Sequence, residues 1–288
     1  MAVEKVLLLH GPMLSRGINP VTQNLYHDAD GREASRSTFN CDQTVIALAH
    51  VFRHHGYKIA YSGWADDTEW LESNRALFDY MVISDQNVLP SESVRNGKVL
   101  VNNKVKLYYG ALAGLRLVKQ HLGEDAIVFR LRSDVAVHQA HAMADMNRIA
   151  RGSKMVLIEY LNVDNMFAVP DFMIMGEVAV LEAIYESLYT RGAEGNSYHL
   201  SSHVDHSFTY LAMQKAGVVG EVQCMSRANF DSVVWRGVPR YFEYMFPNFS
   251  NNLFFDGRLS VSPQLDLDQL IASIPPELSG KDQNQPKP

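Results

Sequence analysis

The sequence predicts an α/β fold: a mostly parallel sheet with helices on both faces, followed by a C-terminal extension. Two observations favour it. Short continuous apolar runs, such as Val-Leu-Leu-Leu at residues 6–9, are typical of strands that are buried on both faces. Between these runs, apolar residues recur every three or four positions, which is the pattern of a helix with one buried side. A regular alternation of strand and helix is how parallel sheets are built.

The first half of the chain supplies three of the strands. The expected elements are, in chain order, a strand at 6–9, a helix at 43–55, a strand at 58–64, a short helix within 66–78 and a strand at 80–83. Residues 13–40 are polar and contain several glycines and prolines, so we expect one long loop there. Long loops inside compact domains are usually functional or disordered.

The second half continues the alternation and then loses it. The expected elements are a helix from about 108 to 122, a strand opening at 126–129, a helix at 139–150, a strand at 155–158, an apolar run at 171–176, and helices at 178–190 and 203–216. We therefore expect a main domain over residues 1–224 and an irregular, aromatic-rich extension over 225–274 that packs on it. Residues 275–288 are polar and rich in proline, which predicts a disordered tail.

The composition of the chain indicates which classes of binding partner to expect. The chain has 288 residues, 47% of them hydrophobic, which suffices for one large domain. The formal net charge is −6 and no face is evidently basic, so we expect no nucleic-acid partner. No apolar run is long enough for a secretion signal or a membrane span, and the two cysteines match no metal-ligand spacing. These features predict a cytoplasmic protein, with peripheral contact at the inner face of the membrane left open.

The strongest candidate for chemistry is Arg132-Ser133-Asp134, which follows the fourth expected strand. Ligands of open α/β sheets bind beyond the carboxyl ends of the strands. A carboxylate there can hold a divalent cation that bridges a diphosphate, and an arginine can contact phosphate directly. The alternative is an ion pair that serves only the structure.

Two other strand ends carry weaker candidates. His10 and Gly11 end the first strand, and Gly11 would let the backbone approach a ligand closely, with Arg16 nearby in the following loop. Asp85 ends the third strand and could accept hydrogen bonds from a base or a ribose. An ordinary Gly-Pro turn and a capped turn are the alternatives.

A polar cluster opens the last expected helix. In the segment 201–206 (Ser-Ser-His-Val-Asp-His), Asp205 or His206 could be the base that deprotonates an acceptor hydroxyl. Asp205 also has the spacing of a helix cap. A third reading groups His199, His203 and His206 as a metal site. Asp171, just before the apolar run at 172–176, could hydrogen-bond the hydroxyls of a sugar acceptor, or could simply begin a strand.

Residues 102–137 resemble the WavE-type family of lipopolysaccharide-synthesis proteins. The resemblance rests on Asn102-Asn103, on Gly114-Leu115 in the helix that follows, and on the strand that ends in Arg132-Ser133-Asp134, with Arg130 where the family usually has lysine. The ends of the first two strands and the segment 171–176 are similar too. The resemblance implies a glycosyltransferase of GT-A-like fold that uses a nucleotide-sugar donor.

The resemblance also bears on the metal and on the reaction. GT-A enzymes bind donor and metal through Asp-x-Asp, and here Arg132 occupies the first position, so only Asp134 remains as a ligand for Mg²⁺ or Mn²⁺ and the need for a metal is left open. The implied reaction is an inverting sugar transfer to a surface polysaccharide, either lipopolysaccharide or capsule, whose acceptor could be lipid-linked. The rivals are a nucleotide-sugar hydrolase and a non-catalytic sugar- or nucleotide-binding module.

We therefore predict three sets of site residues. We expect His10, Gly11, Arg16, Asp85, Arg132 and Asp134 to bind the donor, Asp134 to bind the metal, and Asp171, Asp205 and His206 to be catalytic. If Asp134 serves only the ligand, its replacement by asparagine should abolish activity and leave the melting temperature nearly unchanged.

Overall fold

The computed structural model describes residues 3–18, 36–89, 92–95, 98–101, 104–162, 169–193, 202–239 and 253–254. At its centre is a seven-stranded sheet in the order β13-β10-β12-β8-β1-β4-β5. The strands are β1 (Lys5–His10), β4 (Lys58–Trp64), β5 (Tyr80–Ser84), β8 (Ile127–Arg132), β10 (Val156–Ile158), β12 (Met173–Glu177) and β13 (Val222–Cys224). All pairings are parallel except those of β12, which is antiparallel to both neighbours.

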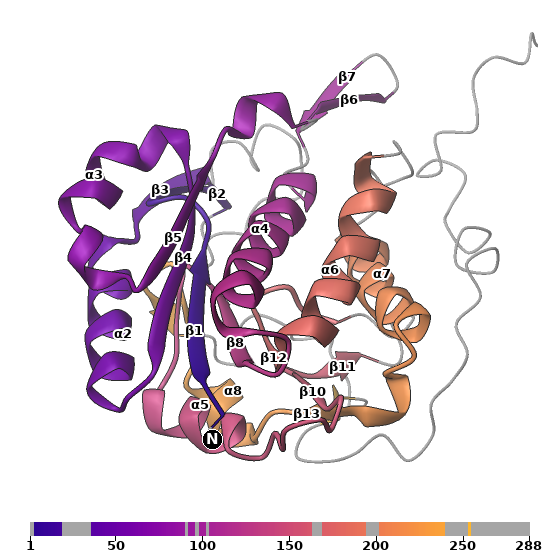
Figure 1. Ribbon diagram of the computed structural model, residues 1–288. Coiled ribbons are helices and arrows are strands. Elements are labelled where there is room, and N and C mark those ends of the chain that lie inside the picture. The colour runs from indigo at the N-terminus through magenta and orange to yellow at the C-terminus, as the bar shows by residue number, and fades with distance from the viewer. Residues whose placement is uncertain are drawn as a thin grey trace, which may run out of the picture.

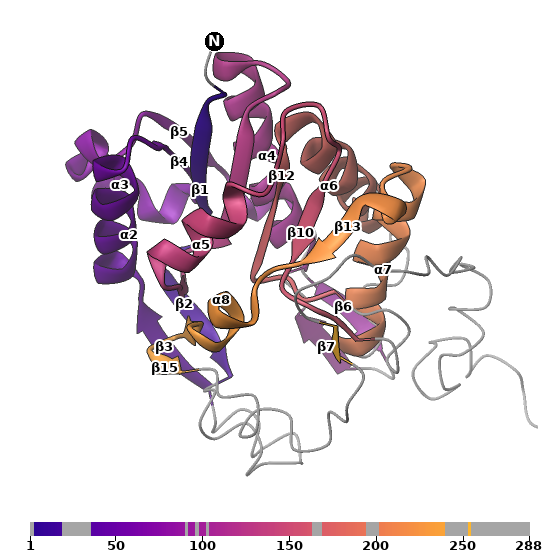
Figure 2. The ribbon, with the colours of Figure 1, turned by 90° about the horizontal axis from the view of Figure 1, so that it is seen from below.

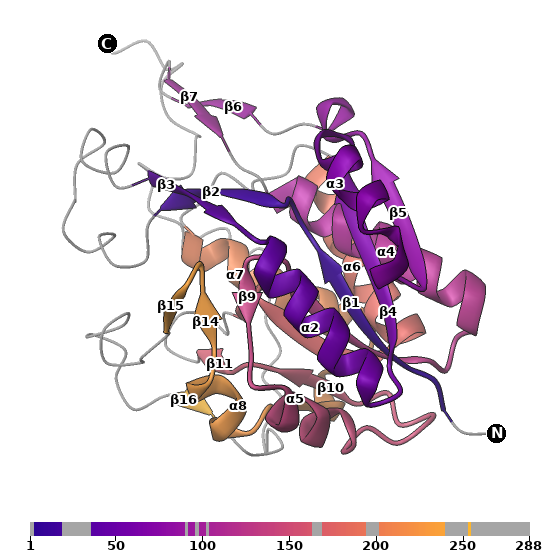
Figure 3. The same ribbon diagram turned by 90° about the vertical axis from the view of Figure 1, so that its left-hand side faces the viewer.

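Helices cover both faces of this sheet (Figures 1 and 3). One face carries α2 (Asp42–His54), α3 (Thr68–Ser73) and α5 (Gln139–Met146), and the other carries α4 (Lys104–Leu122), α6 (Val178–Ala193) and α7 (Ser202–Lys215). Within β1, Leu7 and Leu9 pack toward α2, whereas Val6 and Leu8 pack toward α4. Successive side chains of a strand point to opposite faces, so an unbroken apolar run serves two cores. The predicted α/β fold class is confirmed.

Small antiparallel hairpins, which the sequence did not predict, surround the sheet. β2 (Leu14–Ile18) pairs with β3 (Arg36–Asn40), and β6 (Glu92–Arg95) pairs with β7 (Lys98–Val101). The expected single loop over 13–40 is thus wrong at both ends, while 19–35 lies outside the described residues. Leu14 faces Asn40, so the pairing depends on a contact across 26 positions that no local pattern reveals.

Short helices complete the described chain. The expected helix within 66–78 is divided into η1 (Ala65–Asp67), α3 and η2 (Arg75–Leu77), and the helix expected over 139–150 ends at Met146. The remaining short helices are η3 (Gln86–Val88), η4 (Val219–Glu221) and α8 (Arg227–Asp231). No helix of the described residues is both long and apolar enough to cross a membrane.

The beginning of the predicted extension is part of the main domain. β14 (Val234–Trp235) forms a hairpin with β15 (Val238–Pro239), which lies beside β3 (Figure 2), and β14 also pairs with β9 (Val135–Ala136), directly after Asp134 (Figure 3). β11 (Leu161–Asn162) pairs with β16 (Leu253–Phe254). Residues 234–235 thus pair with a strand of the main domain, while most of 240–274 and the tail at 275–288 lie outside the described residues.

Candidate functional site

The ends of β1 and β8 lie side by side at the carboxyl edge of the sheet. His10 faces Arg132 on one side and Ser62 of β4 on the other. From β1 the chain proceeds to β4 and β5 in one direction, and β8 is then added on the opposite side of β1. Such a reversal of strand order leaves a crevice beyond the strand ends, where ligands of doubly wound sheets bind. The structure therefore brings together His10, Gly11, Arg132 and Asp134, four of the six residues predicted to bind the donor.

Gly11 fixes the turn that follows β1. Its φ of +123° is a conformation that side-chain-bearing residues rarely adopt, and a Cβ atom there would lie 2.8 Å from Ser133 Oγ. Ser133 donates its backbone N–H to the His10 carbonyl (2.9 Å) and its hydroxyl to the Pro12 carbonyl (2.8 Å). The Tyr61 hydroxyl donates to the Gly11 carbonyl (2.9 Å). The turn after β1 and the turn after β8 are thus locked to each other.

Asp134 is the hub of this edge, with only 4% of its side chain exposed. Arg132 binds it in a two-pronged pair, with Nε 2.9 Å from Oδ1 and an Nη atom 2.8 Å from Oδ2. Oδ2 also accepts from the Ser15 hydroxyl (2.8 Å), Trp235 Nε1 (3.2 Å) and Arg236 Nε (3.0 Å). Burial would raise the pKa of Asp134, but the two guanidinium groups and Ser15 lower it to about 2.

Asp171 extends the network to α4. Lys104 Nζ, in the first turn of α4, lies 2.6 Å from one oxygen of Asp171, and Arg132 lies 3.2 Å from the other. Arg132 also lies over the Phe172 ring, 5.0 Å from its centroid. Burial would lower the pKa of Arg132, but Asp134 and Asp171 raise it above its ordinary value, so the guanidinium stays charged.

Cations outnumber carboxylates in this network. Lys104, Arg132 and Arg236 face Asp134 and Asp171. Arg130 adds a fourth cation: it is fully buried and donates to the Asp171 carbonyl (2.6 Å), while its Nε and its second Nη have no hydrogen-bond partner among the described residues. Four cations and two carboxylates thus meet in the described part of this edge. The N-terminus of α4, where Lys104 lies, adds the positive end of a helix dipole.

His10 is buried next to these arginines. Burial, and then the charges of Arg130 and Arg132, lower the pKa of His10 well below its ordinary value. Its Nε2 has no hydrogen-bond partner in the described part of the chain. The imidazole is therefore neutral at physiological pH and adds no charge to the site.

Replacing His10 with glutamine should weaken the dependence of stability on pH. Below the ordinary histidine pKa of about 6.5 the unfolded chain binds a proton that the folded chain does not. Because the folded pKa is depressed, His10 contributes its full stability above pH 6.5 and loses it as the pH falls, with a slope of up to about 1.4 kcal/mol per pH unit. Urea unfolding between pH 7 and pH 5 measures this slope. His50→Gln, on an exposed position of α2, should keep the slope of the wild type. An unchanged slope in His10→Gln would show that His10 is not the group responsible.

Two residues that were predicted to bind the donor substrate, Asp85 and Arg16, do not belong to this network of described residues. Asp85 is exposed and its carboxylate accepts from the backbone N–H of Asn87 (2.8 Å), so it caps η3, as the alternative proposed. Arg16 is exposed on β2. Asp205 and His206 belong to the first turns of α7, but their side chains lie outside the described residues, as does His199. Their roles stay predictions.

The described residues of this edge do not fit a divalent cation. Four donor atoms bind Oδ2 of Asp134 and Arg132 binds Oδ1, and the described residues include no group of three His, Cys, Asp or Glu side chains that could hold a metal ion. Asp134 binds guanidinium groups here instead.

Sequence reasoning missed Arg236, which lies 102 positions from Asp134. Arg236 and Gly237 have φ values of +49° and +76°, which makes them the two-residue turn between β14 and β15. An X-Gly pair between short apolar segments could have indicated this hairpin. No sequence pattern near residue 236 indicates that Arg236 pairs with Asp134.

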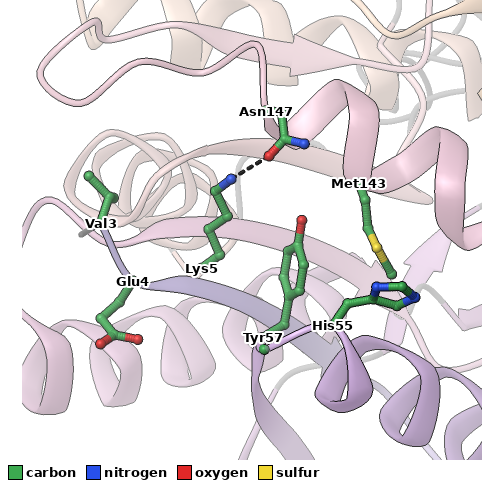
Figure 4. A pocket seen from close by; sticks show the side chains of 8 residues that line it. Val3, Glu4, Lys5, His55, Tyr57, Met143 and Asn147 are labelled. Atoms are coloured by element: carbon green, nitrogen blue, oxygen red, sulfur yellow. Dashed lines mark hydrogen bonds between the residues drawn. The ribbon is translucent and has the colours of Figure 1, made fainter.

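A separate pocket lies at the opposite, amino edge of the sheet (Figure 4). Its lining residues come from the start of β1, the end of α2 and α5, and are Val3, Glu4, Lys5, His55, Gly56, Tyr57, Met143 and Asn147. Lys5 Nζ donates to the side-chain oxygen of Asn147. None of the predicted site residues lines it, and it lies away from the strand ends where doubly wound sheets bind ligands.

No protein-family model matches this chain, and no curated protein matches it in sequence. Similar solved structures include 4-diphosphocytidyl-2C-methyl-D-erythritol synthase from Anaerococcus prevotii, with 11% identity and a TM-score of 0.40 over 85% of this chain and 95% of that one. Mouse xyloside xylosyltransferase 1, in its apo form, is similar with 8% identity and a TM-score of 0.38 over 78% of this chain and 86% of that one. At these values the similarity describes the arrangement of the chain and says nothing of its chemistry. The resemblance to the WavE-type family stays a hypothesis from short motifs.

Proposed function

We propose that this protein is a glycosyltransferase that moves a sugar from a nucleotide-diphosphate donor to a surface-polysaccharide acceptor. One observation carries the proposal: a cluster of cations, centred on Arg132, lies where β1 and β8 end and the strand order reverses. A crevice at this position is where doubly wound sheets bind nucleotides, and guanidinium forks match phosphate oxygens. The short WavE-like motifs and the GT-A-like expectation point to the same chemistry.

In this proposal the diphosphate approaches the two turns that follow β1 and β8, which Gly11 and Ser133 hold together. Arg132 and Lys104 stabilise the negative charge that develops on the departing nucleoside diphosphate as the bond to the sugar breaks. Neutral His10 lines the base of the same crevice. The acceptor oxygen then forms the new bond to the sugar and loses its proton to a base.

The base is proposed to be Asp205, with His206 as the second candidate. Both lie at the start of α7, which packs against α6 and runs back from the carboxyl edge of the sheet (Figure 1). Asp171, bound by Lys104 and Arg132, orients these two cations in addition to any contact with the acceptor. The inverting course of the reaction is part of this proposal.

The proposal is tested with UDP-, GDP- and dTDP-sugars and a lipopolysaccharide-derived oligosaccharide as acceptor. A raised melting temperature with one donor, and nucleotide release that depends on the acceptor, would support a transferase. Release that is independent of acceptor indicates a hydrolase, and binding without release indicates a non-catalytic module. No thermal shift with any donor would contradict the proposal.

Asp205→Asn separates chemistry from helix capping. Asparagine caps a helix about as well as aspartate, so the melting temperature should hardly change. If Asp205 is the base, turnover should fall by about 10²–10⁴-fold, the usual contribution of such a group. Full turnover in the variant would reduce Asp205 to a cap and leave His206, tested as His206→Gln, as the candidate.

A further inference from the structure

We infer that this site binds the diphosphate without a divalent cation, because guanidinium and ammonium groups occupy the cation's place. The inference rests on the proposed function and specifies how the donor is held. It concerns Arg132, Arg236 and Lys104, the three cations that are paired with the two carboxylates of the site.

The first argument is the occupancy of Asp134. A carboxylate offers about four lone-pair positions. Oδ2 of Asp134 already accepts from four donor atoms and Oδ1 from one, at 2.8 to 3.2 Å, and the side chain is 4% exposed. A cation at Oδ2 would have to displace one of its donors, and a cation at Oδ1 would lie beside the guanidinium of Arg132, which has the same sign of charge.

The second argument is that Asp171 is engaged as well. Lys104 and Arg132 approach its two oxygens at 2.6 and 3.2 Å, and 9% of its side chain is exposed. Arg132 therefore bridges both carboxylates of the site. Bringing a cation to either carboxylate would break a pair in which Arg132 takes part.

The third argument is the state of Arg130. This guanidinium is fully buried beside the carbonyl of Asp171, and among the described residues two of its N–H donors, at Nε and at one Nη, have no hydrogen-bond partner. Buried donors without partners are costly in a purely structural network. A buried guanidinium with donors to spare repels a metal ion and attracts an anion, which indicates an anion site.

The placement of Arg236 supports a built site. Its φ of +49° belongs to the two-residue turn between β14 and β15, and this turn places its guanidinium next to Asp134. A Cβ atom on Gly17 of β2 would lie 2.5 Å from an Nη atom of Arg236, so the guanidinium rests on bare backbone. The glycine at position 17 and the turn at 236–237 together hold this second guanidinium against Asp134.

Calorimetric titration of the full chain with UDP, GDP and inorganic pyrophosphate tests the inference, in EDTA and then in Mg²⁺ or Mn²⁺. We expect at least one of these probes to bind in EDTA, with an affinity that changes less than about threefold when the metal is added and that falls as salt is raised. Binding only in the presence of metal would overturn the inference and leave the proposed transferase standing. No binding under either condition would overturn both.

A matched pair of variants locates the binding. Arg132→Met should weaken the affinity in EDTA by tenfold or more, whereas Arg116→Met, on an exposed part of α4, should leave it unchanged. Circular dichroism first establishes that each variant is folded. A folded Arg132→Met with wild-type affinity would overturn the inference; if this variant does not fold, the comparison of EDTA with metal on the wild-type chain decides.

Discussion

Asp134→Asn should lower the free energy of unfolding by about 3–5 kcal/mol, the usual cost of removing one partner from a buried ion pair. Asparagine has nearly the same shape, so the loss comes from the charge. Arg132 and Arg236, both mostly buried, would keep their positive charges without the carboxylate that now binds them. Because this rearranges Arg132, affinity for the donor should fall as well. Urea denaturation at pH 7 measures the first effect and titration with the donor measures the second.

Asp125→Asn is the control for this change. Asp125 pairs with Arg151 at the surface, where both side chains are more than half exposed, and such pairs contribute about 0–1 kcal/mol. If Asp134→Asn is as stable as Asp125→Asn, the carboxylate does not organise the site and the network described here is wrong.

The pH profile gives a second check on Asp134. Its folded pKa of about 2 is below the ordinary value of about 3.9, so the unfolded chain takes up the proton first as acid is added. The wild type should therefore hold this contribution above about pH 4 and lose it as the pH falls toward 2. In Asp134→Asn that part of the acid sensitivity should be missing.

Gly11→Ala should cause the largest loss among the glycines of the site. A φ of +123° costs a residue with a side chain about 1–3 kcal/mol, and the new methyl would lie 2.8 Å from Ser133 Oγ, so overpacking adds about 1–3 kcal/mol. The shift should also separate the turns after β1 and β8 and reduce donor binding. Denaturation and titration measure the two effects.

Gly123→Ala is the matched control, because its φ is +85° and a Cβ atom there meets nothing within 4 Å. It should show only the conformational cost, about 1–2 kcal/mol, and unchanged donor binding. Equal losses of stability in both variants would mean that the contact with Ser133 relaxes freely.

The central architecture could be predicted because its signals are local. The apolar runs at 6–9, 59–61 and 126–129 predict β1, β4 and β8, and apolar residues recur at helical spacing in α4, so a few neighbouring residues are enough to indicate each element. The antiparallel direction of β12 could not be predicted, because the apolar pattern of a buried strand is the same in parallel and in antiparallel pairing. One rule, that ligands bind beyond the carboxyl ends of the strands, was enough to predict that four residues lie together: His10, Gly11, Arg132 and Asp134.

The role that the sequence predicts for Asp134 differs from the contacts that the structure shows. The sequence predicts a ligand contact whose loss spares the fold, whereas the structure shows a carboxylate bound by two arginines. Ser15 and Arg236 come from short hairpins whose pairing depends on distant partners, and no periodicity marks them. Asp85, at a strand end like Asp134, turned out to cap its own turn, because the next residues fold back onto it.

The contacts of Asp134 also determine when the site can form during folding. Ser15 is 119 positions away along the chain and Arg236 is 102 positions away, and closing such long loops is slow. The strands β1, β4, β5 and β8 all precede residue 133, so they are made long before the hairpin at 234–239. A chain still emerging from the ribosome, with residue 236 not yet made, would hold Asp134 with some of its donors missing. The full set of contacts around Asp134 is therefore a property of the nearly complete chain and is acquired late.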